Sequence, residues 1–265
     1  MLAASGGQIL AGGTDFYPGL GERLPQGDVI DITSLREIRG ISFQSEWIRI
    51  GGLTTWTEII RTPLPCCFDG LKAAAREVGS LQIQNRGTVA GNLCNASPAA
   101  DGVPPLLALD AEVELTSSKG TRRLPVEQFI MGNRKTARLP GEILAAVYIP
   151  RRIEDAASSF LKLGARRYLV ISISMVAAIL QTDDDGLIAE SRIAVGSCSV
   201  SAKRLRKLEQ DLLGQPSTGG IGTFVRAEHL SDLSPITDVR ATADYRRDAS
   251  LTLVRRALEA CVEDR

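Results

Sequence analysis

The sequence predicts an α+β fold in two parts. In its N-terminal half, short apolar strands alternate with helical patterns. Further along, residues 158–163, 173–181 and 187–195 have the pattern of an antiparallel meander, and two amphipathic helices complete that part. We therefore expect two domains, one over residues 1–155 and a smaller one over residues 156–265.

The strands of the first part are predicted from short runs of apolar and β-branched residues that end at turn residues. These runs cover residues 8–11, 29–32, 48–52, 111–116 and 143–149. Pro150 closes the last of them, because proline cannot donate to a strand ladder.

The helices are predicted from capping residues and apolar spacing. A threonine cap opens the helix over residues 54–60, and Gly79 is placed to stop the helix over residues 68–78. Further helices are predicted over residues 103–109, 201–213 and 245–262.

Charge and hydropathy exclude two classes of partner. The 265 residues include 31 basic and 31 acidic side chains, so there is no electrostatic reason to expect binding to nucleic acid. The longest apolar stretch, residues 169–180, contains two serines and is too short to span a bilayer. The first residues do not resemble a secretory signal, and we expect a cytoplasmic protein.

The cysteines and the single histidine predict no metal centre and no catalytic triad. None of the five cysteines forms a Cys-x-x-Cys pair, so zinc and iron–sulfur sites are disfavoured and buried thiols in a reducing compartment are expected. His229 lies in a polar stretch, where we expect a surface residue. No catalytic side chain is predicted.

Two glycine-containing passages have the composition of ligand-binding loops. In the first, an apolar run ends at Gly12 and Gly13, and Thr14 and Asp15 add a hydroxyl and a carboxylate. Glycines let backbone N–H groups approach an anion such as phosphate. For either passage alone, a simple tight turn remains the alternative.

The second passage, "NRGTVAGNLCNASPAAD" over residues 85–101, supplies Thr88, Gly91 and Asn92. Two such loops predict a two-part ligand, for which a dinucleotide is the natural candidate. Neither passage contains the P-loop motif or the Rossmann Gly-x-Gly-x-x-Gly motif.

The segments "ILAGGTDFYP" and "QNRGTVAGNLCNASPAADGVPPLLALDAEVEL" resemble the flavin-binding segments of the FAD-binding subunits of molybdenum hydroxylases, the xanthine dehydrogenase and carbon monoxide dehydrogenase medium-subunit family. "GEILAAVYIP", "FLKLGARR" and "YRRDASLTLVRRAL" resemble later segments of that family. The resemblance implies an FAD-binding domain of the vanillyl-alcohol-oxidase type, followed by a C-terminal domain of the carbon monoxide dehydrogenase flavoprotein type.

The resemblance also implies which residues bind FAD. The first segment, which wraps the pyrophosphate, falls on Ile9, Leu10, Ala11, Gly12, Gly13, Thr14, Asp15 and Phe16. The second, which completes the cradle and approaches the flavin, falls on Thr88, Val89, Ala90, Gly91 and Asn92. Further matched positions are Asn95, Asp101, Ile143, Leu144 and Lys162.

Several of these positions have structural alternatives. Asp101 could cap the following helix, Ile143 and Leu144 could be strand core, and Lys162 could be a solvated strand residue. Ala90 stands where the family more often has glycine, and the chain has about a strand and a helix less before the first loop than family members usually have. We therefore expect either a truncated chain or another element that covers this edge.

As for function, the resemblance implies an oxidoreductase subunit that transfers electrons through FAD. In the family, substrate is hydroxylated at a molybdenum cofactor on a large subunit, iron–sulfur clusters on a small subunit carry the electrons, and the flavin passes them to NAD+ or another acceptor. Two alternatives stay open: a stand-alone flavin-dependent oxidoreductase, and a family member that has lost FAD and acts as a scaffold.

Overall fold

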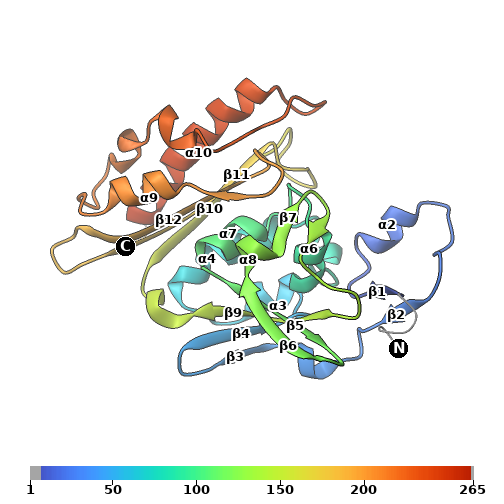
Figure 1. Ribbon diagram of the computed structural model, residues 1–265. Helices are drawn as coiled ribbons and strands as arrows, with labels where there is room; N and C mark the ends of the chain where they lie inside the picture. The colour runs from blue at the N-terminus through green and yellow to red at the C-terminus, as the bar shows by residue number, and fades with distance from the viewer. Residues whose placement is uncertain (1–6, 264–265) are drawn as a thin grey trace.

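The computed structural model describes residues 7–263 and shows a mixed α/β molecule built in layers (Figure 1). A five-stranded antiparallel sheet forms one side, a four-stranded antiparallel sheet forms the other, and helices lie between them. Two further helices cover the outer face of the four-stranded sheet. The α+β fold class predicted from the sequence is therefore confirmed.

The five-stranded sheet supports the first part of the chain. In spatial order its strands are β3 (Ile41–Phe43), β4 (Trp47–Gly51), β9 (Ile143–Pro150), β5 (Glu112–Ser117) and β6 (Gly120–Pro125). Alternate residues of β4 face opposite sides, so Ile48 and Ile50 are fully buried while Trp47 is only partly covered. Strand β9 lies between β4 and β5, and the sheet is complete only when this late strand is in place.

The inner face of this sheet is covered by α3 (Trp56–Arg61), α4 (Asp69–Glu77), α6 (Val89–Asn95) and α7 (Val103–Ala108). The predicted threonine cap of α3 is Thr55, whose Oγ1 accepts from the Glu58 backbone N–H at 3.3 Å while the Glu58 carboxylate accepts from the Thr55 N–H at 2.8 Å. Beyond α4, Gly79 takes the left-handed φ of 55° that the predicted stop requires.

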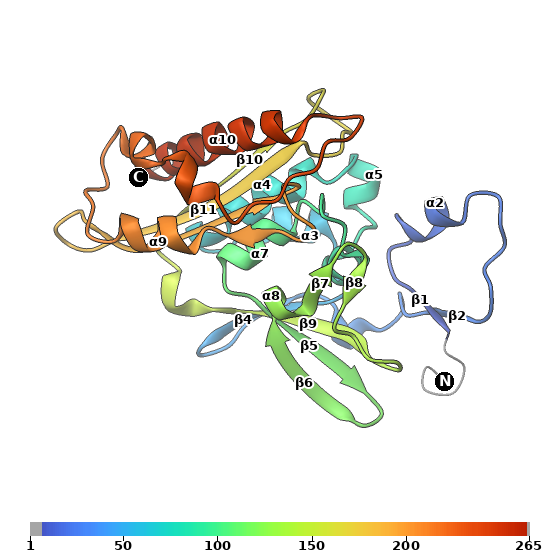
Figure 2. The same ribbon diagram turned by 45° about the horizontal axis from the view of Figure 1, so that its top comes forward.

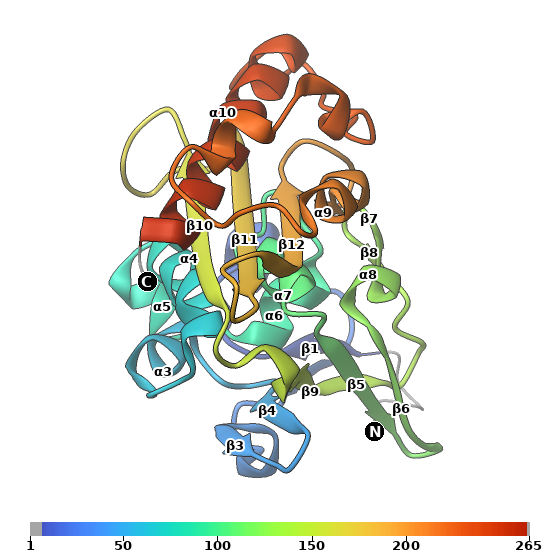
Figure 3. The ribbon, with the colours of Figure 1, turned by 90° about the vertical axis from the view of Figure 1, so that its left-hand side faces the viewer.

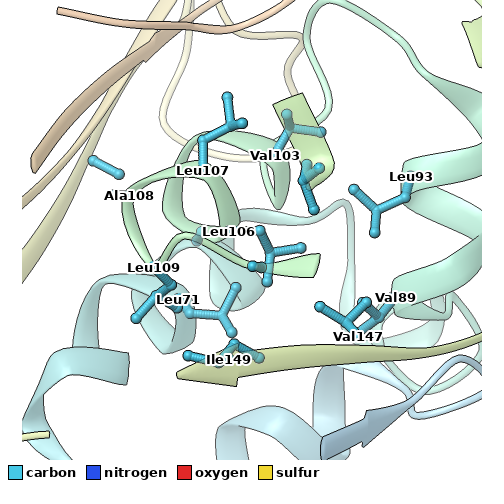
Figure 4. Close-up of a cluster of buried hydrophobic side chains, with 14 of the residues drawn as sticks. Leu71, Val89, Leu93, Val103, Leu106, Leu107, Ala108, Leu109, Val147 and Ile149 are labelled. Atoms are coloured by element: carbon cyan, nitrogen blue, oxygen red, sulfur yellow. The ribbon is translucent and has the colours of Figure 1, made fainter. Parts of the chain in front are cut away.

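The largest apolar core joins these layers. Figure 4 shows Leu71 of α4, Leu93 of α6 and Leu106 of α7 gathered above Val147 and Ile149 of β9. All five side chains are at most 1% exposed. Each such side chain contributes about 1.5–3 kcal/mol of burial free energy, so the helices that carry the second glycine passage are firmly placed.

The four-stranded sheet consists of β10 (Ala157–Leu163), β11 (Ser174–Thr182), β12 (Ile188–Gly196) and β13 (Lys203–Arg204). Helices α9 (Arg206–Leu212) and α10 (Ala243–Glu263) cover its outer face (Figure 3). Strand β11 is buried on both faces: Met175, Ala177 and Ile179 join the central core, and Val176, Ala178 and Leu180 join the core beneath α9 and α10. This explains its nearly continuous apolar sequence.

Charged side chains connect the two parts. Asp110, which follows α7, accepts from Arg204 Nη1 at 2.7 Å and lies 3.4 Å from Arg192 Nη1, and both arginine side chains are almost fully buried. Strand β9 ends at Pro150 and β10 begins at Ala157. The domain boundary near residue 155 stays a prediction.

The first glycine segment belongs to a small unit at the edge of the molecule. Strands β1 (Gln8–Leu10) and β2 (Val29–Asp31) pair in parallel, and α2 (Phe16–Leu20) stands apart from the body in Figures 1 and 2 and has no buried residue. Ile9 and Ala11 attach the unit to a small apolar cluster. The predicted short lead-in falls mainly on residues 1–6, outside the described residues.

Three sequence expectations are corrected. The helix predicted over residues 201–213 begins only at Arg206, because Lys203 and Arg204 pair with β12. The passage over residues 85–101, which we expected to be a loop, contains α6. His229 is buried: its Nδ1 accepts from the Arg226 N–H at 3.0 Å, and its Nε2 lies 3.2 Å from Asp211 Oδ2.

Within residues 7–263, no helix combines the length and the apolar character that a membrane crossing requires.

Candidate functional site

A cavity of about 530 Å³ lies between the N-terminal unit and the body of the molecule. Its walls come from residues 9–16, from residues 87–95 around α6, from residues 134–138, and from the start of β9. The two glycine passages, more than seventy residues apart in sequence, therefore face the same space.

Gly12 and Gly13 allow the first segment to reach the second. A Cβ on Gly12 would lie 1.9 Å from the Arg86 carbonyl oxygen, so only glycine permits this contact. Gly13 has a φ of 75° and turns the chain toward α2. The glycine pair therefore serves a close approach between two backbone segments as well as the predicted turn.

The second segment is the first turn of a helix. Thr88 caps α6, and its Oγ1 accepts from the Gly91 N–H at 3.0 Å. At Ala90, where the resemblance implies a glycine, the Cβ lies 3.1 Å from the position that a Cβ on Gly52 would occupy. Its methyl group is therefore directed toward Gly52, in the body of the molecule.

Asn92 carries an unpaired acceptor beside the cavity. Its Oδ1 is buried and has no hydrogen-bond partner among the described residues. Gly102 lies close by, since a Cβ there would be 2.9 Å from this oxygen. A buried polar atom left without a partner costs about 1–3 kcal/mol, so this oxygen is a candidate to accept a hydrogen bond from a bound ligand.

Most of the residues predicted to bind a cofactor line this cavity. They are Ile9, Ala11, Gly12, Gly13, Thr14, Asp15, Phe16, Thr88, Ala90, Gly91, Asn92, Asn95, Ile143 and Leu144. Leu10 and Val89 belong to the same segments, but they are buried residues outside the lining. Asp101 and Lys162 also lie outside the lining.

Asp101 and Lys162 instead form a buried ion pair. Lys162 Nζ on β10 lies 2.7 Å from Asp101 Oδ2, and Ser172 Oγ donates to Asp101 Oδ1 at 2.7 Å. Burial raises the pKa of Asp101 more than Lys162 and Ser172 lower it. Neither alternative for these residues is correct: α7 has no side-chain cap, and Lys162 is not solvated.

Sequence reasoning missed several cavity residues. They are Ile32, Trp56, Val78, Gly87, Cys94, Arg134, Thr136 and Arg138. Gly87 and Cys94 lie inside the second quoted segment, so they could have been predicted from the residues predicted to bind the cofactor on either side of them. Burial raises the pKa of the Cys94 thiol to about 11, which keeps it protonated and unreactive.

Arg134 and Arg138 come from a hairpin whose sequence contains no recognisable binding motif. Strands β7 (Ile130–Gly132) and β8 (Lys135–Thr136) place Arg134 at the cavity, and Arg138 follows β8. The charged side chains that line the cavity are those of Arg134, Arg138 and Asp15, so two positive charges stand against one negative charge. This balance favours an anionic ligand.

Glycine-containing segments on two walls, an unpaired acceptor and surplus positive charge are typical of proteins that bind a nucleotide cofactor, and this is the class that the cavity favours. A model of the FAD binding domain in molybdopterin dehydrogenase matches residues 1–152. A model of the CO dehydrogenase flavoprotein C-terminal domain matches residues 159–261.

Individual proteins agree with these matches. The nicotinate dehydrogenase FAD-subunit of Eubacterium barkeri is 36% identical over 79% of this chain and 73% of its own length. A putative xanthine dehydrogenase FAD-binding subunit of Escherichia coli K12 is 31% identical, over 96% of this chain and 88% of that protein. A structure of carbon monoxide dehydrogenase from Hydrogenophaga pseudoflava aligns with a TM-score of 0.89 at 26% identity, covering 98% of this chain and 90% of the other.

The chain therefore belongs to the family of FAD-binding subunits of molybdenum hydroxylases, as a subunit of an oxidoreductase with FAD as cofactor. The predicted two-part arrangement, an FAD-binding domain followed by a flavoprotein C-terminal domain, is confirmed by both family matches. The residues present fit the cofactor, because the cavity offers an anionic ligand surplus positive charge and a free acceptor.

Proposed function

We propose that this chain is the electron-transfer subunit of a molybdenum hydroxylase, in which FAD accepts electrons from iron–sulfur clusters on a partner and passes them to NAD+ or another acceptor. The observation that supports this best is the shared cavity of the two glycine passages. Flavin supplies the redox chemistry, so the protein's tasks are to bind, orient and partly shield it.

Within the cavity, each segment has a separate task. Gly12 and Gly13 bring backbone N–H groups toward the pyrophosphate, Arg138 adds positive charge, and Asn92 Oδ1 accepts a hydrogen bond from the cofactor. Ile143 and Leu144, at the start of β9, supply apolar surface. No general base is required for this task.

Asp101 and Lys162 support the cavity from behind its lining. Lys162 Nζ donates to the Glu77 carbonyl at 3.2 Å, and the next residue, Val78, lines the cavity. Their role in cofactor binding is thus to fix the position of the wall. The same pair ties β10 of the second part to the first.

The proposed partners are a large subunit with the molybdenum cofactor and a small subunit with the iron–sulfur clusters. Similar proteins are named FAD-subunits or medium chains of dehydrogenases, which supports a multi-subunit complex. None of the five cysteines, all of which lie within residues 7–263, forms a disulfide bond, as expected of a protein from the reducing cytoplasm. We therefore also propose a cytoplasmic location.

Two measurements on the purified chain test whether it binds FAD and which acceptor takes the electrons. We expect a yellow protein, or a colourless one that takes up one FAD per chain on reconstitution. A chain that binds no FAD under either condition would overturn the proposal and favour the scaffold. Reduced, FAD-loaded chain is then mixed with NAD+ or with artificial acceptors, and the return of oxidised-flavin absorbance identifies the acceptor.

The partners are tested by affinity capture of the tagged chain from its native cells. We expect subunits that contain molybdenum and iron in metal analysis. An FAD-loaded chain that is recovered alone and itself oxidises small molecules would instead show a stand-alone flavin-dependent oxidoreductase.

A further inference from the structure

The tip of the β7–β8 hairpin fixes one arginine beside the cavity. Arg134 has a left-handed backbone, with a φ of 53°, and its N–H donates to the Ala96 carbonyl at 2.8 Å. Ala96 ends α6 and is itself left-handed. The backbone of the hairpin tip is therefore attached to the end of the helix that carries the second glycine passage.

The side chain of Arg134 reaches the other wall. Its Nη1 donates to Asp15 Oδ2 at 3.1 Å and also to Asn95 Oδ1, so one nitrogen joins the first segment to α6. Arg134 and Asp15 are 119 residues apart in the sequence. Asp15 precedes α2, but its carboxylate makes no capping hydrogen bond and is free for this ion pair.

This bridge matters because the first segment is otherwise weakly held. Helix α2 has no buried residue, and the apolar contacts of the N-terminal unit lie at its strands, with Ile9 and Ala11. In Figure 2 the hairpin lies on the side of the body that faces α2. The Arg134 side chain therefore fixes where residues 12–16 stand relative to α6.

Stability of the fold does not explain the arrangement. The side chains of Arg134 and Asp15 are 62% and 56% exposed, and exposed ion pairs stabilise folded proteins only slightly. A left-handed backbone is also unfavourable for a residue with a Cβ. The short turn between β7 and β8 accounts for this backbone, whereas an exposed pair that adds little stability and lies at the cavity points to a role in placing Asp15 and Asn95.

We propose that Arg134 is a positioning residue of the FAD site, which holds Asp15 and Asn95 together so that both walls meet the cofactor in one arrangement. The inference rests on the proposed FAD binding. Without the bridge, the first segment would have to be ordered when FAD binds, and that ordering would weaken the affinity.

The test is FAD affinity, measured by titrating apo chain and following flavin fluorescence. Arg134→Ala should weaken binding about fivefold, the upper range for an exposed ion pair. Arg134→Lys should recover part of the loss, since one ammonium can still reach Asp15. Asp15→Asn should weaken binding similarly, and the Arg134→Ala/Asp15→Asn double variant no more than the larger single change.

Arg206→Ala is the matched control. Arg206 forms a similar long-range ion pair with Glu127, at 2.9 Å and with 52% and 53% side-chain exposure, and neither residue lines the cavity. Its FAD affinity should equal that of the wild type. Circular dichroism and thermal unfolding of each apo variant identify any that fail to fold, in which case Arg134→Lys and Asp15→Asn carry the test.

Two results would overturn the inference while leaving FAD binding intact. One is an Arg134→Ala chain that binds FAD as tightly as the wild type. The other is additive losses in the double variant, which would mean that Arg134 contacts the cofactor independently of Asp15. A wild-type chain that binds no FAD would instead overturn the proposed function itself.

Discussion

Lys162 Nζ and Asp101 Oδ2 lie 2.7 Å apart in side chains that are only 5% and 10% exposed, although 61 residues separate them in the sequence. Lys162 belongs to β10 and Asp101 to the connection between α6 and α7, so the ion pair joins the second part of the chain to the first. Ser172 donates to the remaining carboxylate oxygen.

Removing the cation should destabilise the protein in a pH-dependent way. Lys162→Met leaves a buried carboxylate uncompensated, which costs about 3 kcal/mol. Burial already raises the pKa of Asp101, and loss of Lys162 raises it further. A raised pKa means that the folded chain holds the proton on Asp101 more tightly than the unfolded chain does. Protonation of Asp101 therefore stabilises the fold at low pH, and this stabilisation is lost as the pH rises through the raised pKa.

Urea unfolding at pH 5 and pH 8 measures this effect. Lys162→Met should lose more free energy of unfolding at pH 8 than at pH 5, whereas Lys119→Met, in an exposed turn, should lose little at either. Equal losses at both values of pH would show that Asp101 does not titrate as its burial implies.

Much of the fold could be predicted because its strands and helices carry local signals. Strand β11 has a long apolar run because both of its faces are buried. The start of α3 could be predicted from the capping box that Thr55 and Glu58 form. Strand β13 could not be predicted, because Lys203 and Arg204 form a strand only by pairing with β12. Helix α6 was missed because its glycine and asparagines favour loops, while Thr88 and the core favour the helix.

The cavity was predictable where its residues are contiguous in sequence. The segments around Gly12 and Gly91 could be identified from composition and resemblance. Arg134 could not, because its role depends on a contact with Asp15 that exists only in the folded chain. His229 was misplaced for a related reason, since its ring contacts Phe224 and Asp211 only in the folded chain.

The close approach of Gly12 to the second segment predicts a specific defect in cofactor binding. In Gly12→Ala the new methyl group would lie 1.9 Å from the Arg86 carbonyl oxygen, so the first segment must move away from Arg86. We expect FAD affinity to fall at least about tenfold. Gly19→Ala is the control, since a Cβ there meets nothing within 4 Å and alanine favours the helix.

Isothermal titration of both variants with FAD compares them directly. Unchanged affinity in Gly12→Ala would place the cofactor away from this segment. Neither Gly12 nor Gly19 belongs to the main apolar core around Leu71 and Val147, so urea unfolding should show that the body of the molecule is preserved.

Glu142 should contribute stability that disappears in acid. Hydrogen bonds from Arg122, at 2.6 and 2.9 Å, lower the pKa of this carboxyl; burial raises it, and the Leu139 N–H, at 2.7 Å, lowers it further. A lowered pKa means that the stabilisation is present above the ordinary value of 4.5 and is lost as the pH falls through the lowered one.

Glu142→Gln keeps the shape and removes the charge. Above pH 5 it should cost about 1 kcal/mol, because solvent around the partly exposed Arg122 screens the ion pair, and the difference from the wild type should shrink as the pH falls. Urea unfolding from pH 7 to pH 3 measures it. The control is Glu127→Gln, an exposed partner of Arg206, for which little change is expected. A difference that stays constant with pH would contradict the lowered pKa.

Asn92 gives a prediction in which stability and affinity change in opposite directions. Its Oδ1 is buried without a partner among the described residues, so Asn92→Ala removes a desolvated atom that contributes nothing to the apo fold. The free energy of unfolding should stay the same or rise by up to about 1 kcal/mol. FAD affinity should fall about tenfold, because one hydrogen bond to the cofactor is lost.

Asn85→Ala should show the reverse pattern. The Asn85 Oδ1 accepts from Thr57 Oγ1 at 2.6 Å and lies outside the cavity lining, so its loss should slightly lower stability and leave FAD affinity unchanged. Urea unfolding of the apo chains and fluorescence titration with FAD give both quantities for both variants. If Asn92→Ala loses stability and keeps its affinity, the unpaired oxygen faces the protein and the cofactor takes its hydrogen bonds elsewhere.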